Sequence, residues 1–276
     1  MTNIFKQQEE QNARIKRSMQ SVKHLIAIAS GKGGVGKSTV AANLALSLAK
    51  EGYNVGLADA DIYGPSVPTL FNIANPQIMA YEKDGQQLMI PMERFGIKLM
   101  SVGFFVNNMQ PLAWRGPMAS NTLIQILADT EWGELDFLLL DLPPGTGDIQ
   151  LTLAQLFPVE GAVIVSTPQE LAKADVRRAV SMFREKGIET PVLGLVENMA
   201  YFVPPAHPDE KYHIFGKEGC IDIAKELDIE LLAQIPIGQD IADANDSGNP
   251  IAMDFEAENA KVFMDLADKI TAKLTE

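Results

Sequence analysis

The sequence of 276 residues has a single cysteine, Cys220, so no disulfide can form within the chain. A small secreted protein stapled by disulfides is therefore excluded, and the composition suits a reducing compartment. Basic residues are also scarce, because 23 lysines and arginines stand against 36 acidic residues, for a net charge of -13. A protein that binds duplex nucleic acid needs a basic face for the phosphates, so we expect no nucleic-acid partner.

The chain also lacks a long hydrophobic run. No segment approaches the roughly 20 apolar residues that span a bilayer, and the polar start of the chain lacks the apolar region of a signal peptide. We therefore expect a cytoplasmic protein that does not bind a membrane. Residues 1–21 predict a polar N-terminal arm, and the absence of a linker predicts a single domain over residues 22–276.

Short apolar runs alternate with stretches of helical periodicity. Most runs are apolar on both faces, as in strands that helices cover on either side. This alternation predicts an α/β fold with a doubly wound, mostly parallel sheet and helices on both faces. The expected strands are residues 24–30, 54–59, 97–102, 136–141, 162–166, 192–197 and 231–235. The expected helices are residues 38–51, 118–128, 172–186, 217–227 and 254–274.

Two excursions interrupt this alternation. Residues 75–95 contain Asp84–Gly85, a hairpin signal. Residues 199–219 are too polar and too rich in proline for a regular element.

A glycine-rich loop between the first expected strand and helix matches the pattern G-x-x-x-x-G-K-[ST]. Its glycines let successive backbone N–H groups curl around phosphate oxygens, and the following helix directs its positive end at the same anion. The spacing predicts that Lys37 pairs with the β- and γ-phosphates, that Ser38 ligates Mg²⁺ and that Thr39 assists at the α-phosphate. The loop comprises Gly31, Lys32, Gly33, Gly34, Val35, Gly36, Lys37 and Ser38.

Carboxylates end two of the expected strands. Asp59 and Asp61 follow one strand, and Asp141 ends another in the Walker B arrangement, where it can hold Mg²⁺ through water. One carboxylate near the γ-phosphate can orient the attacking water while another supports the Mg²⁺ shell. Residues 143–148, which include two glycines, form a loop suited to move with the nucleotide state.

Lys32, directly after the first glycine, resembles the signature lysine of the deviant Walker A group, which includes MinD, ParA, the nitrogenase iron protein and Mrp proteins. The resemblance implies a homodimer in which Lys32 reaches the nucleotide of the partner. It also implies that Asp61 orients the water and that Asp59 supports it.

Seven motifs extend the resemblance over nearly the whole chain, which is similar to the Mrp/ApbC-type P-loop ATPases. That family implies slow ATP hydrolysis by a homodimer that delivers iron–sulfur clusters to apo iron–sulfur proteins. It also implies adenine contacts from Asn198 and from the segment that contains Pro236. The motifs are SGKGGVGKST, DADIYGPSVP, WRGPM, DLPPGTGD, STPQELAKADVRRA, ENMAYF and IFGKEG.

The sequence departs from this family at its C-x-x-C pair. Pro204 and His207 stand where the two cysteines are expected, and a proline cannot ligate iron. Clusters such as [4Fe-4S] prefer four thiolates. Cys220 does not align with either position, and the simplest interpretation is that its side chain is a small, buried part of the core rather than an iron ligand. His207 and His213 are further candidate ligands.

Three hypotheses therefore stay open. The first is an ATPase that carries clusters with an unusual ligand set or with ligands from a partner. The second is a nucleotide-dependent dimer switch in cluster assembly that holds no cluster. The third is a positioning ATPase similar to MinD or ParA. The last expected helix does not favour this hypothesis, because the spacing of its apolar residues, including Phe255 and Phe263, is typical of core packing.

Overall fold

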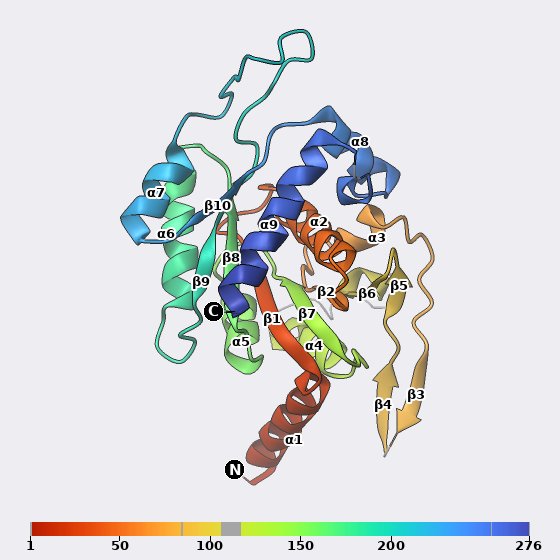
Figure 1. Ribbon diagram of the computed structural model, residues 1–276. Coiled ribbons are helices and arrows are strands. Elements are labelled where there is room, and N and C mark those ends of the chain that lie inside the picture. Colours follow the sequence, from red (N-terminus) through yellow and green to blue (C-terminus); the bar gives the residue numbers. More distant parts are fainter. Residues whose placement is uncertain (1, 84, 106–116, 255, 276) are drawn as a thin grey trace.

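The computed structural model describes residues 2–83, 85–105, 117–254 and 256–275. These residues form an eight-stranded sheet with the strand order β10-β9-β8-β1-β7-β2-β6-β5 (Figure 1). Seven strands run in parallel, and only the edge strand β5 is antiparallel to its neighbour. The strands are β1 (Val22–Ala29), β2 (Val55–Asp59), β5 (Met92–Arg94), β6 (Ile97–Ser101), β7 (Leu135–Asp141), β8 (Gly161–Ser166), β9 (Val192–Glu197) and β10 (Leu231–Gln234).

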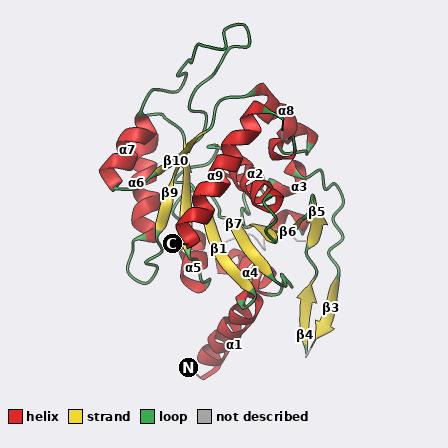
Figure 2. Ribbon diagram, in the orientation of Figure 1, coloured by secondary structure: helices red, strands yellow, loops and turns green. Residues whose placement is uncertain are grey.

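Helices cover both faces of this sheet. Figure 2 shows α2 and α9 in front of the strands and α4 and α5 behind them. The seven predicted strands and the doubly wound, mostly parallel architecture are therefore confirmed. The helices are α1 (Thr2–Met19), α2 (Lys37–Lys50), α3 (Val67–Leu70), α4 (Pro117–Ala128), α5 (Asp148–Leu156), α6 (Ala172–Phe183), α7 (Gly219–Leu227), α8 (Gln239–Ser247) and α9 (Glu258–Thr275).

The central strands are buried on both faces. Every residue of β2 and β8 is buried, as are all residues of β1 from Leu25 onward. This burial explains why the apolar runs do not alternate with polar residues. In α9, Phe263, Leu266 and Ile270 lie in the core, which agrees with the packing expected from their spacing. Phe255 lies outside the described residues, as do Trp114–Gly116 of the WRGPM motif.

Three predicted helix limits are wrong. The last helix begins at Glu258 rather than at residue 254, because a short 3-10 turn, Ile251–Met253, follows Pro250. The helix expected from residue 217 begins at Gly219, since Glu218 has a left-handed φ of 68°. The helix expected to reach residue 186 ends at Phe183, ahead of a turn in which Gly187 has a φ of 94°.

The hairpin predicted in the first excursion is present. Strands β3 (Ala80–Lys83) and β4 (Gln86–Met89) pair antiparallel, and Gly85 turns with a φ of 75°; Asp84 lies outside the described residues. Strand β5 was not predicted, since three residues at a sheet edge are too few for a period to appear.

The N-terminal segment is a helix docked on the body. Ile15 and Met19 of α1 are 3% and 6% exposed, and the guanidinium of Arg14 pairs with the carboxylate of Asp129 just after α4. Among the described residues, no helix combines the length and apolar composition of a bilayer span. Residues 199–218 contain no helix or strand, as expected. Phe202 forms isolated bridges with Tyr212 and with Ile237, which connect the excursion to itself and to the segment after β10.

Candidate functional site

A cavity of about 720 Å³ opens at the carboxyl ends of the central strands, beside the start of α2. Ligands of doubly wound sheets bind at this edge. The glycine-rich loop forms its floor, and segments from elsewhere in the chain complete the wall. Besides Ser30 and residues 32–39, the lining residues are Asp61, Tyr63, Gly64, Pro65, Ser66, Thr69, Leu70, Pro144, Asn245 and Asp246.

Three glycines of the loop are required by its geometry. Gly34 and Gly36 have left-handed φ values of 77° and 81°, which residues with a Cβ rarely adopt. Gly31 packs against the backbone of Asp175 and Gly36 against the amide of Asn198, so a Cβ at either position would collide. The loop is thus held by α6 on one side and by the end of β9 on the other.

The loop leads directly into α2, whose first N–H groups have no partners within the helix. Such N–H groups and the positive end of the helix dipole attract an anion. The curled loop and the helix start therefore form a backbone cradle for phosphate groups.

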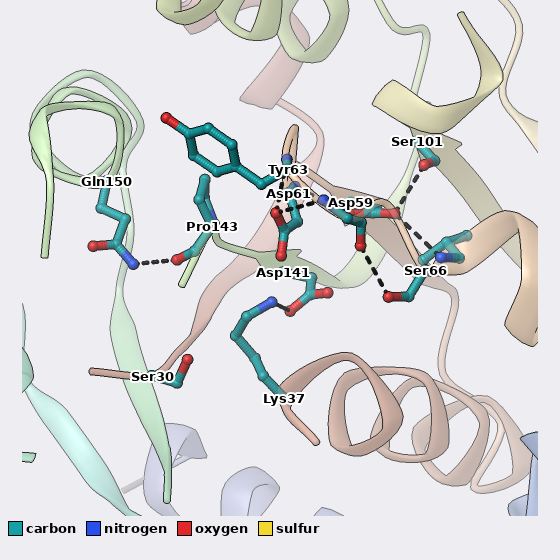
Figure 3. Close-up of polar contacts among 12 residues, drawn as sticks. Ser30, Lys37, Asp59, Asp61, Tyr63, Ser66, Ser101, Asp141, Pro143 and Gln150 are labelled. Carbon is teal, nitrogen blue, oxygen red and sulfur yellow. Dashed lines mark hydrogen bonds and ion pairs between the residues drawn. The ribbon is translucent and has the colours of Figure 1, made fainter. Parts of the chain in front are cut away.

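Lys37 and Asp141 form a buried ion pair in this cradle. The Nζ atom of Lys37 lies 2.5 Å from Oδ1 of Asp141, and the two side chains are 5% and 0% exposed (Figure 3). Burial raises the pKa of Asp141, and the Lys37 ammonium and the Ser38 hydroxyl oppose this shift. The pair thus provides each buried charge with a counterion of opposite sign.

The second oxygen of Asp141, Oδ2, is buried and has no hydrogen-bond partner among the described residues. An unpaired buried carboxylate oxygen is costly. A hydrated Mg²⁺ would satisfy it, since this ion prefers oxygen ligands and retains several waters. With the Ser38 hydroxyl on the same cavity wall, the donor set fits a magnesium ion.

Asp59 does not line the cavity but fastens the loop that does. Its carboxylate accepts hydrogen bonds from the Asp61 amide, the Val67 amide and the Ser101 hydroxyl at 3.1, 3.2 and 2.8 Å. Burial, with the neighbouring Asp141 charge, raises the pKa of Asp59 to about 7. Asp59 therefore holds residues 60–67 in place through these hydrogen bonds.

Asp61 lines the cavity itself and is 8% exposed. Its Oδ1 accepts hydrogen bonds from the amides of Tyr63 and Gly64 at 3.1 and 3.2 Å (Figure 3). These bonds make a tight turn that aims the carboxylate group at the phosphate loop. Among the described residues its Oδ2 has no hydrogen-bond partner, and Asp61 lines the cavity that a ligand would enter.

Lys32 also lines the cavity. In the part of the chain that the structure describes, its ammonium has no ion-pair or hydrogen-bond partner, and only its carbonyl is engaged, by the Ser30 hydroxyl. A half-buried ammonium without a counterion adds positive charge to the mouth of the site.

The expected adenine residues lie beside the loop rather than in the lining of this cavity. The Asn198 amide donates a hydrogen bond of 2.8 Å to the Val35 carbonyl. Pro236 follows β10, and the backbone bond from Ala200 to Ile235 places its segment next to the residues after Asn198. The structure thus brings both segments to the phosphate loop, and their contact with a base stays a prediction.

Sequence reasoning missed the contribution of α8. The Asn245 amide donates a 3.1 Å hydrogen bond to the Thr39 hydroxyl, although 206 residues separate them. Asn245 and Asp246 close one side of the cavity. No local pattern could have found them, because only the tertiary fold brings α8 to α2.

The candidate iron ligands do not form a site. Cys220 is 1% exposed, and burial followed by the Glu197 carboxylate raises the pKa of its thiol. His207 is exposed beside Glu210, whereas Nδ1 of His213 lies 3.2 Å from the Ala200 carbonyl oxygen. Within the described ranges, no three His, Cys, Asp or Glu side chains are grouped so that they could hold a metal ion.

Comparison with known proteins agrees with this geometry. Residues 21–271 match a ParA family model described as the NUBPL iron-transfer P-loop NTPase. An iron–sulfur cluster carrier protein of Aquifex aeolicus is 49% identical over 95% of this chain and 70% of its own length. The iron–sulfur cluster transfer protein NUBPL of Dictyostelium discoideum is 46% identical over 94% of this chain and 79% of its own.

A solved structure shows the same fold with a nucleotide. It is a nucleotide-binding protein from Archaeoglobus fulgidus in complex with ADP, with a TM-score of 0.77 and 39% identity. The alignment covers 92% of this chain and 96% of that one.

Proposed function

The chain belongs to the NUBPL iron-transfer family of P-loop NTPases, and on that premise we propose that it hydrolyses MgATP slowly as a homodimer and transfers iron–sulfur clusters to apoproteins. The observation that carries the nucleotide part is the buried Lys37–Asp141 pair, with its unpaired Asp141 oxygen, at the floor of the phosphate cradle. The relatives described as cluster carriers support the transfer part.

Nucleotide binding reorganises the buried pair. The Lys37 ammonium turns from Asp141 to the β- and γ-phosphates, while loop amides hold the remaining phosphate oxygens. Asp141 and the Ser38 hydroxyl would then be the residues that hold Mg²⁺, Asp141 through a water molecule. When bound, Mg²⁺ neutralises phosphate charge.

Three further side chains and the Pro236 segment act on the γ-phosphate and the base. Asp61 orients the attacking water, because its carboxylate reaches the cavity from a fixed turn. The unpaired ammonium of Lys32 crosses to the nucleotide of the partner subunit and stabilises the charge that develops there. Asn198 and the Pro236 segment hold the adenine, so the bound nucleotide is ATP.

Cluster transfer to a defined acceptor tests this proposal. The protein is incubated anaerobically with iron, sulfide and thiol, desalted, and mixed with an apo-ferredoxin, whose circular dichroism reports the arrival of a cluster. We expect transfer by the wild type, a changed rate when MgATP is added, and no effect of MgATP on Lys37→Ala. Failure to load a cluster or to pass it on would contradict the carrier function.

One observation favours a second candidate, a nucleotide-dependent switch in cluster assembly that itself holds no cluster. The single thiol is buried, and the described residues offer no other grouped ligands. In that case the same incubation leaves the protein colourless, yet it still hydrolyses ATP and accelerates transfer from a separate cluster donor to the apo-ferredoxin.

A further inference from the structure

A second cavity, of about 440 Å³, lies next to the nucleotide cavity, between the 143–150 loop, α5 and the first turn of α4. Tyr63 and Pro144 line both cavities and so form a shared wall. In Figure 3, Tyr63 extends from the Asp61 turn to the side of Pro143 and Gln150. The Tyr63 ring is 75% exposed, although it borders two hollows of the molecule.

The polar groups of this cavity are hydrogen-bond acceptors. No lysine or arginine occurs among the described residues that line it. Hydroxyl, amide and carboxylate oxygens can all accept, and an aromatic ring face attracts a cation. The polar and aromatic lining residues are Tyr63, Ser120, Asn121, Asp148, Gln150 and Thr152. A cavity with a carboxylate, several acceptor oxygens and an aromatic ring suits a cationic ligand with several N–H donors.

Two acceptors in the lining are unused. Gln150 is 1% exposed and its Nε2 donates to the Pro143 carbonyl, but its buried Oε1 has no partner. The Asp148 carboxylate, in the first turn of α5, likewise has no ion-pair or hydrogen-bond partner among the described residues. A buried amide oxygen without a donor is costly, so the site is incomplete as it stands.

We propose that this cavity binds the guanidinium group of an arginine side chain from a partner protein. A guanidinium offers five N–H donors in a plane, which can reach Asp148 and Gln150 and stack on the Tyr63 ring. The net charge of -13 steers a basic partner to the molecule, which favours an arginine-bearing partner protein for this cavity.

The site is coupled to the nucleotide because the cavities share Tyr63 and Pro144. Asp141, Pro143 and Gln150 belong to one short segment, in which the Gln150 amide holds the Pro143 carbonyl. A nucleotide that displaces the Lys37–Asp141 pair therefore changes the wall of the second cavity. By linkage, the arginine and the nucleotide alter each other's affinity by the same factor.

The test uses Nα-acetylarginine methylamide as the probe, and the citrulline analogue, which has the same shape without the charge, as its control. Both are titrated into the full-length protein, and binding is followed by NMR shifts. We expect the arginine probe to bind at least about tenfold more tightly than the citrulline probe. Asp148→Asn should remove this preference, whereas Asp265→Asn, an equal charge change on the exposed side of α9, should keep it.

Several outcomes would overturn the proposal. Equal binding of the two probes, no binding of either, or the same loss in both variants would each exclude a guanidinium site in this cavity. A change in the mass of the protein in solution on Asp148→Asn alone would assign the cavity to a second copy of the chain. The predicted coupling between the arginine and the nucleotide rests on the proposed function. If MgATP binds to the protein but leaves the affinity for the arginine probe unchanged, the coupling is excluded.

Discussion

Lys37 and Asp141 are 104 residues apart in the chain, yet their charged atoms lie 2.5 Å apart in the core. The two groups that a P-loop protein needs for phosphate and for magnesium therefore neutralise each other. Because a buried charge is costly when it is alone, each is stable here only with its partner or with a ligand in its place. In the function proposed here, the nucleotide with its metal ion would be such a replacement, and the pair would serve as a pre-formed receptor.

Lys32→Ala should separate binding from turnover. The Lys32 ammonium has no partner among the described residues, and the hydrogen bond from Ser30 reaches the backbone carbonyl, so loss of the side chain leaves the fold and the phosphate cradle intact. We expect the affinity for MgATP to change by less than about threefold while hydrolysis falls by about a thousandfold, the range of a charge supplied across an interface. Phosphate release measures this, with Lys186→Ala, an exposed lysine, as the control. Unchanged turnover in the Lys32 variant would contradict a shared site.

Asp61→Asn should slow hydrolysis by about a hundredfold without loss of stability. The asparagine carbonyl can still accept the hydrogen bonds from Tyr63 and Gly64, so the turn is retained. Asp61→Ala loses those bonds as well and should unfold at lower urea concentration. If the asparagine variant kept full turnover, Asp61 would not orient the water.

Cys220 should resist alkylation in the folded protein. Burial raises the pKa of its thiol above the ordinary value of 9.0, so raising the pH from 7 to 9 creates thiolate only in the unfolded chain. The stability that the buried neutral thiol contributes is therefore intact below pH 9 and is lost as the pH rises further. Iodoacetamide labelling, read by mass spectrometry with and without urea, measures the difference. Rapid labelling of the native protein at pH 8 would restore Cys220 as a candidate iron ligand.

Ile15→Ala should loosen α1 from the body. The Ile15 side chain is 3% exposed, and truncating such a residue costs about 2–4 kcal/mol. The neighbouring Lys16 is exposed, so Lys16→Ala is a matched control. Hydrogen exchange of the α1 amides should speed up in the first variant only. Equal exchange in the two variants would mean that α1 is not held by its apolar face.

Much of the sheet was predictable because its strands are short apolar runs, each of which ends in a turn or a polar residue. The parallel order follows from the helices between them, and the phosphate loop is recognisable from eight consecutive residues. The edge strand β5 was not predictable, because Met92–Arg94 shows no period. Helix limits were wrong where a left-handed residue such as Glu218 ends the regular backbone.

The site was predictable only where its residues belong to a local motif. The hydrogen bond from Ser101 to Asp59 joins two strands 42 residues apart, and α8 reaches Thr39 across most of the chain. Such contacts depend on the assembled sheet, and no local spacing encodes them. The second cavity likewise arises where the Asp61 turn meets α4 and α5.

We expect the glycine-rich loop, Lys37 and Asp141 to bind MgATP together. Isothermal titration of MgATP into the purified protein tests this expectation. Lys37→Ala removes the buried lysine, and Lys23→Ala, which removes the exposed lysine paired with Asp136, is the matched control. We expect saturable heat with one nucleotide per chain for the wild type and Lys23→Ala, and none for Lys37→Ala. Absence of heat from the wild type, or equal heat from Lys37→Ala, would contradict it.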